Sequence, residues 1–331
     1  MLLAAAVASC SKNDVIGEVV GEAISFGDVF VGKPTKAGDQ SHTVDNLNAF
    51  YVFGNVELNK IVANTVNLYS QVPVTRTTGS TSWNYPEEYI QYWLPGCNYK
   101  FAAVSDLDNT NISVTAVNGF PQSISYNVAA QRDLLYAEVT DVVTEPTGAP
   151  TSSSGAIDAT TKTVDFTFNH LLSKVQFEFT NNFATETGVE LTVTGITIKG
   201  AAMESTYSVS TKTWGTTSGT ADIDFGSTSA IQPGGKKGTS SNVCFLIPTT
   251  QNFDIFFIVT HNKGGNPTPK TITMTNVTLQ PGFSYNFTAE LNSGNVQGVV
   301  PIKFEINRGG WSEDNVSVGP DVNEGEVTQQ Q

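Results

Sequence analysis

Few residues of this sequence have the types and spacing that catalysis or metal binding requires. Its three histidines are isolated along the chain, and its three cysteines never occur as Cys-x-x-Cys, so the sequence offers no frame for a metal ion. It contains no His-Glu-x-x-His motif, no phosphate-binding glycine loop and no dinucleotide-binding glycine motif. Adjacent carboxylates such as Glu87 and Glu88 would face opposite sides of a strand, which makes them poor acid-base pairs. We therefore expect no enzymatic activity, no metal and no cofactor.

One segment is rich in aromatic rings whose chemistry would suit sugar binding. Trp83 and Trp93 bracket it, and three tyrosines lie between them. Exposed rings in a row could stack against a glycan, which makes Trp83 and Trp93 candidate stacking residues. The other interpretation is an aromatic-rich hairpin in the hydrophobic core. The sequence leaves both interpretations open.

The elements that must position these residues are strands. Of 331 residues, 39% are hydrophobic and only 15% are charged, which is enough apolar material for sizeable cores and excludes disorder over most of the chain. The chain has 29 glycines and 19 phenylalanines but only 3 methionines, a balance that favours strands and turns over helices. These features indicate an all-β protein.

Periodicity locates the strands. Apolar residues alternate with polar ones over residues 164–168 and again over 175–179, which is typical of half-buried antiparallel strands. Residues 170–173 between them predict a turn or a strand crossing. The aromatic and β-branched run at 48–56 predicts a strand buried on both faces. Further strands are expected at 191–198, 206–209, 253–260, 271–279, 284–291 and 299–306.

Charge and the start of the chain bear on partners and location. The 17 basic and 31 acidic residues give a formal net charge of −14, which argues against a nucleic-acid partner. Residues 1–9 are mostly apolar and end in small residues directly before Cys10, a pattern similar to a bacterial lipobox. We expect a lipid such as palmitate on Cys10, removal of the preceding signal and anchoring to the outer membrane.

Cys97 and Cys244 are expected to be buried and unpaired, although they could pair if the fold brings them together.

Several short motifs, in this order, resemble those of the fimbrillin-like surface lipoproteins of Bacteroidetes, a family related to type V pilins. The motifs lie at residues 10–12, 24–26, 35–37, 48–54, 132–137, 168–175, 279–285 and 309–311. This resemblance implies two transthyretin-like antiparallel β-sandwich domains in tandem. It also implies a cell-surface fimbrial component or adhesin whose partners are other fimbrial subunits and an unknown surface receptor.

In pilins of this kind, an N-terminal strand is removed by proteolysis, and a strand of a neighbouring subunit fills the groove that remains. The resemblance places the removable strand at residues 23–31, with Ile24, Phe26 and Val29 on its inward face. The matching processing position holds Lys36 followed by Ala37, where pilins have an arginine. The segment at 321–331 contains only two valines among acids and amides, which is unsuited to a donor strand. We therefore expect an accessory, tip or anchor subunit more readily than a stalk pilin.

The expected organisation follows from these signals. A signal at 1–10 precedes a tether and removable strand at 11–37, and sandwich domains are expected at 38–150 and 151–331, the second with a polar tail. The boundary rests on the stretch at 143–159, which is rich in proline, glycine, serine and threonine. The alternative function is that of a glycan-binding surface lipoprotein.

Overall fold

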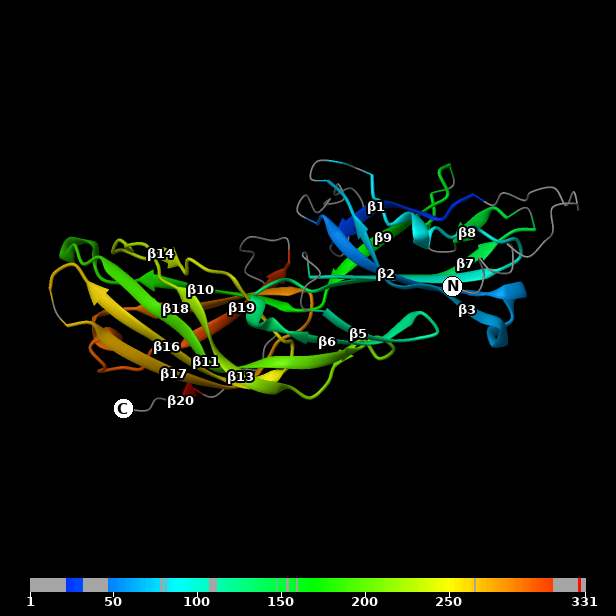
Figure 1. Ribbon diagram of the computed structural model, residues 1–331. Coiled ribbons are helices and arrows are strands. Elements are labelled where there is room, and N and C mark those ends of the chain that lie inside the picture. The colour runs from blue at the N-terminus through cyan, green and yellow to red at the C-terminus, as the bar shows by residue number, and fades with distance from the viewer. Residues whose placement is uncertain are drawn as a thin grey trace, which may run out of the picture.

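The protein is built from β-sheets, as its sequence predicts. A computed structural model describes residues 22–31, 47–77, 80, 82–106, 112–146, 148–152, 155–158, 160–264, 266–311 and 327–328. Their strands form three sheets grouped in two lobes (Figure 1). No helix in this described part has the length and apolar character that a membrane span needs.

The strands are β1 (Ser25–Val31), β2 (Ala49–Glu57), β3 (Thr65–Thr75), β4 (Asn98–Ser105), β5 (Ile112–Val117), β6 (Phe120–Asn127), β7 (Leu135–Thr144), β8 (Pro150–Ser152), β9 (Thr163–His170), β10 (Ser173–Asn181), β11 (Leu191–Ser208), β12 (Thr213–Trp214), β13 (Ser218–Gly226), β14 (Lys236–Thr239), β15 (Cys244–Leu246), β16 (Thr250–His261), β17 (Thr268–Thr278), β18 (Phe283–Leu291), β19 (Phe304–Gly310) and β20 (Val327–Thr328). The helices are short: η1 (Leu58–Lys60), η2 (Val62–Asn64), η3 (Glu87–Tyr89), η4 (Val128–Ala130), η5 (Thr185–Thr187) and α2 (Ser293–Val296).

The first sheet has the order β1-β9-β7-β4-β2-β3, with β8 attached to β7. It folds back on itself, because β9 pairs with β7 only through Leu135 and Tyr136. The rings of Phe26 on β1 and Tyr69 on β3 therefore meet across the core, with centroids 5.8 Å apart. This lobe is thus closed by a small layer, β1 and β9, lying over a larger layer.

Strand β2 is buried on both faces, as predicted for residues 48–56. Phe50 and Val52 belong to the core beneath β1, whereas Phe53 belongs to a second core that continues into the other lobe. Strand β6 contributes Ile124 and Tyr126 to that second core. The two faces are buried because each of them meets a different hydrophobic cluster.

The second lobe is a sandwich of two sheets. One has the order β14-β10-β18-β19 with β15 attached to β10, and the other has the order β20-β17-β16-β11-β6-β5 with β12 and β13 attached to β11. Phenylalanines from both sheets interlock between them; for example, the centroid of Phe177 on β10 lies 4.7 Å from that of Phe225 on β13. Cys97 and Cys244 are buried and free, as expected.

The sheets do not divide the chain at residue 150. Strands β5 and β6 join the third sheet through β11, while β9 belongs to the first sheet. The crossing from β9 to β10 at residues 170–173 passes from the first sheet to the second, as one of the two interpretations of these residues predicted. The tandem arrangement of two transthyretin-like domains with a boundary at 150 stays a prediction.

Two details differ from a simple antiparallel pattern. The pairs β1–β9 and β10–β18 are parallel, and each joins segments far apart in sequence, as a parallel pair requires.

Strand β11 replaces the two strands expected at 191–198 and 206–209. Gly195 and Gly200 take positive φ angles of 60° and 61°, close to the register shifts at which this long strand bends.

Candidate functional site

Strand β1 lies at the end of the first sheet. It pairs in parallel with β9, from Ser25 opposite Thr163 to Val31 opposite Phe168, and β9 is its one partner among the named strands. Figure 1 shows it beside β9 in the upper part of its lobe. Release of β1 would therefore break one ladder and leave the order of the other strands unchanged.

The inward side chains of β1, with that of Ile24 directly before it, belong to the first core. Ile24, Phe26 and Val29 are all buried, the same three residues that the sequence assigns to this face. Their burial makes the segment part of the core, and three buried apolar side chains contribute roughly 1.5–3 kcal/mol each.

The ring of Phe26 sits among four other aromatic rings, which we name the aromatic box. The distances between ring centroids are 6.3 Å to Phe50, 5.8 Å to Tyr69, 5.5 Å to Tyr85 and 5.8 Å to Phe166. Phe166 stacks on Phe26 at an interplanar angle of 22°, whereas the other three rings meet it edge-on. These arrangements are favourable for aromatic pairs, so the box is specific for a ring at this position.

The aromatic segment 83–93 fastens the start of β1, and we name it the clasp. The backbone N–H of Ile24 donates to the carbonyl of Gln91 at 2.8 Å, and that of Trp93 donates to the carbonyl of Glu22 at 3.0 Å. The Tyr85 hydroxyl donates to the carbonyl of Ile24 at 2.5 Å. The first residues of the strand are therefore held by backbone contacts that do not depend on side-chain identity.

Trp83 and Trp93 are both buried, so in this structure neither ring offers a face to a sugar. Trp83 packs 4.8 Å from Phe50, and Trp93 packs 4.9 Å from Tyr99, which makes both of them core residues. The surface stacking predicted for the two tryptophans therefore does not occur here, and the core interpretation of the segment is the one that the structure supports.

Sequence reasoning missed a cluster where the lobes meet. His170 Nδ1 lies 2.5 Å from Asp133 Oδ2, and the His170 ring stacks on Trp311 with centroids 4.0 Å apart. Lys174 on β10 donates to the carbonyl of Trp311 at 2.8 Å. Burial raises the pKa of Asp133, although its hydrogen bond to His170 opposes that shift. The cluster ties β9 and the approach to β7 to the sheet of β10 and β19.

Three of the motifs that carry the resemblance meet in this cluster. Asp133 lies in the motif at 132–137, His170 in that at 168–175, and Trp311 in that at 309–311. The sequence shows the order of these motifs along the chain but not that they lie together in the fold. Their convergence at the junction assigns them a structural role in joining the lobes.

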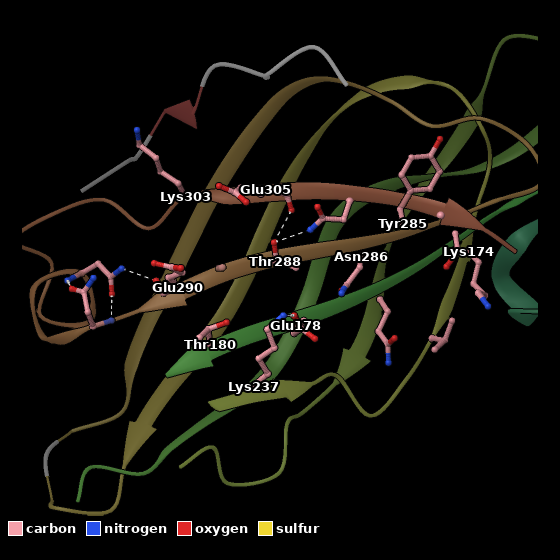
Figure 2. A pocket seen from close by; sticks show the side chains of 18 of the residues that line it. Lys174, Glu178, Thr180, Lys237, Tyr285, Asn286, Thr288, Glu290, Lys303 and Glu305 are labelled. Carbon is pink, nitrogen blue, oxygen red and sulfur yellow. Dashed lines mark hydrogen bonds and ion pairs between the residues drawn. The ribbon is translucent and has the colours of Figure 1, made fainter. Parts of the chain in front are cut away.

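The outer face of the second sheet forms a polar groove of about 690 Å³ (Figure 2). Its charges balance, since three lysines and three glutamates line it: Lys174, Lys237, Lys303, Glu178, Glu290 and Glu305. Lys237 and Glu178 pair at 2.7 Å, and Asn307 donates to Thr288 Oγ1 at 3.2 Å. The groove is thus a hydrophilic surface on which some of the polar groups pair with one another.

Three predicted site residues lie outside the described residues: Cys10, Lys36 and Ala37. Lipidation and processing at these positions therefore stay predictions. Across the described ranges, no three histidine, cysteine, aspartate or glutamate side chains are grouped so that they could hold a metal ion.

Comparison with known proteins identifies the family. The model of the fimbrillin-like family matches residues 35–308. A fimbrial protein from Bacteroides vulgatus is similar in structure, with a TM-score of 0.58 and 16% identity over 88% of this chain and 99% of that one. A candidate cell-adhesion protein from Bacteroides ovatus has a TM-score of 0.53 and 14% identity over 89% of this chain and 99% of that one. No curated protein matches. Because the family model covers most of the sequence, this chain belongs to the fimbrillin-like family.

Proposed function

We propose that this protein is a non-enzymatic component of a fimbrium or an adhesin at the bacterial cell surface. Membership of the fimbrillin-like family supports this role, and so does the similarity to the Bacteroides vulgatus fimbrial protein. Other fimbrial subunits are its proposed partners. A lipid on Cys10 is the proposed anchor to the outer membrane.

The proposed mechanism is exchange of β1 for a strand of another subunit after cleavage between Lys36 and Ala37. The observation that carries this proposal is that β1 ends its sheet while Phe26, Val29 and the preceding Ile24 are buried in the core. Its departure would expose apolar core and a row of unpaired backbone groups on β9, and another strand could satisfy both. The proposed position is that of an accessory, tip or anchor subunit.

Sugar binding is not favoured as the main function. Its support in the sequence was the pair Trp83 and Trp93, and both are buried. The exposed rings of that segment, Tyr89 and Tyr92, remain a small surface feature.

The decisive experiment is to determine the intact mass and N-terminal residue of the protein recovered from its native cell surface. Strand exchange predicts a chain that begins at Ala37, without lipid. A chain that begins at acylated Cys10 would retain β1, and strand exchange would then be wrong even if the protein is an anchor or adhesin.

A further inference from the structure

We infer that the β1 groove selects its occupant by a sequence pattern, and that the partner is a strand of a different subunit. The inference rests on the proposed strand exchange and specifies its partner. The pattern has a branched aliphatic residue, any residue, an aromatic ring, a glycine, any residue and an aliphatic residue. In this chain the six positions are residues 24–29, which begin one residue before β1.

The ring position is set by the aromatic box. Four rings contact Phe26, and they come from four separate parts of the lobe: β2, β3, β9 and the clasp. A smaller side chain would leave their faces and edges without a partner, and an empty space of this kind is costly because packed neighbours relax only in part. The partner strand must therefore bring its own ring.

The glycine position is set by β9. A Cβ atom built on Gly27 would lie less than 3.0 Å from Asp165 Oδ1 and from both Oγ1 and Cβ of Thr163. The register also shifts here, because Phe26 pairs with Val164 while Val29 pairs with Phe166. Three steps along β1 thus match two steps along β9, which is the geometry of a β-bulge. A partner strand that keeps its ring in the box needs a glycine directly after it.

The clasp sets the direction of the incoming strand but does not select its side chains. It binds the backbone of Glu22 and Ile24, and β9 then continues the pairing in parallel from Ser25 onward. An incoming strand would therefore lie with its N-terminal end at the clasp and run parallel to β9. Side-chain selection is left to the three inward positions and the glycine.

No second segment of the chain has this pattern. The other ring–glycine pairs are Phe53–Gly54, Trp214–Gly215 and Phe225–Gly226. The first is preceded by Tyr51 in place of a branched aliphatic residue, and the third is followed by Thr228 in place of an aliphatic residue; the second has neither aliphatic residue. The segment 321–331 contains no aromatic residue, so it cannot fill the box. In a second copy of this protein, the one segment with the pattern is β1 itself, which is removed by the proposed cleavage. The proposed donor strand therefore belongs to a different protein.

The test uses the full chain with a specific protease site inserted between Lys36 and Ala37. After folding and cleavage, labelled peptides with the sequence of residues 22–31 are added in excess, and their incorporation is measured by mass. We expect the native peptide and the Ser25→Ala control to be incorporated equally, because Ser25 is not on the inward face. Phe26→Ala and Gly27→Ala peptides should be incorporated at least about tenfold less. A peptide of residues 321–331 should not be incorporated.

The inference is overturned if the Phe26→Ala, Gly27→Ala or 321–331 peptides are incorporated as well as the native peptide. If no peptide exchanges, including the native one, the proposed strand exchange fails. The pattern is then judged on the uncut chain, where Phe26→Ala and Gly27→Ala should lower the melting temperature and Ser25→Ala should not. Equal melting temperatures for all three variants would overturn the pattern independently of any exchange.

Discussion

The two parallel strand pairs of the molecule, β1–β9 and β10–β18, use similar side chains in different surroundings. Each brings two phenylalanine rings together: Phe26 and Phe166 lie 5.8 Å apart in the first pair, and Phe177 and Phe287 lie 5.3 Å apart in the second. The second pair keeps one register from Lys174 opposite Ser284 to Asn181 opposite Leu291. The first pair contains a shift between Phe26 and Val29.

The two strand pairs differ most in the other strands that flank them. Strand β10 also pairs with β14 and β15, and β18 also pairs with β19, so neither can leave without disrupting the sheet. Strand β1 has a single ladder, with β9, and the residues directly before it are held by the clasp through the bridge from Ala23 to Tyr92 and the hydrogen bond from Tyr85. A buried strand can thus be essential to its core and still be the element whose release disturbs the rest of the fold least.

The largest expected difference concerns one ring in each pair. Phe177→Ala should lower the free energy of unfolding by about 3–5 kcal/mol, because Phe177 contacts rings from both sheets of the sandwich. Phe26→Ala should cost less in global unfolding, because detachment of β1 limits the loss. Urea denaturation measures both values. An equal or larger loss for Phe26→Ala would show that β1 is as integral to its lobe as β10 is to the other.

Hydrogen exchange should separate the strands in the unmodified protein. Backbone amides of β1 should open with a free energy lower than those of β18 by about 2 kcal/mol, or roughly thirtyfold faster exchange at equal intrinsic rates. The reason is that β1 can open alone, whereas β18 opens with its sheet. Exchange followed by mass spectrometry of peptides from the two strands gives the ratio, and similar protection would contradict the comparison.

The clasp offers a smaller and more local change. Tyr85→Phe removes the hydrogen bond to the carbonyl of Ile24 but keeps the ring in the aromatic box. We expect a loss of about 1 kcal/mol, seen as roughly fivefold faster exchange in β1 and no change in β18. Tyr89→Phe is the matched control because Tyr89 is exposed. A uniform effect on both strands would mean that the clasp stabilises the whole protein rather than β1.

The sequence predicted the strands better than it predicted their partners. Alternation at 164–168 and 175–179 located β9 and β10. The resemblance named Ile24, Phe26 and Val29 as an inward face, and all three are buried, while their role in a removable strand stays a prediction. Alternation reports which face of a strand is buried but not what covers it, so the burial of Trp83 and Trp93 beneath other strands was not decided. The strand expected at 299–306 begins only at Phe304, because the short helix α2, capped by Asn292, is followed by a loop in which Ile302 alone is buried.

For a related reason, the sequence could not predict the clasp or the cluster where the lobes meet. Asp133, His170 and Trp311 come from three separate motifs, and only the folded chain brings them together. The clasp acts mainly through backbone groups, which are the same for every residue and leave no signature in the sequence. Long-range pairing of this kind depends on the topology of the sheets rather than on local pattern.

The smallest expected effect depends on pH and is confined to the larger layer of the first lobe, where Glu57 on β2 is buried. Its carboxylate accepts hydrogen bonds from Asn98 at 2.9 Å and Lys100 at 3.1 Å, and these hold its pKa below the ordinary value against the opposing effect of burial. A carboxyl group whose pKa is lower in the folded than in the unfolded chain stabilises the fold above the unfolded pKa, and this contribution is lost as the pH falls through the folded pKa. Glu57→Gln should therefore be less stable than the native protein by roughly 0.5–1 kcal/mol at neutral pH, because Lys100 keeps its charge without a partner.

On acidification the difference between the two proteins should disappear. Melting curves from about pH 7 down to about pH 3 test this, with Glu87→Gln as the control because Glu87 is exposed. If the difference persists at low pH, the loss at Glu57 comes from packing and not from charge. Because Glu57 lies on a strand held on both sides by β3 and β4, its substitution should not speed exchange in β1. Faster exchange in β1 would instead mean that the attachment of the end strand depends on the larger layer beneath it.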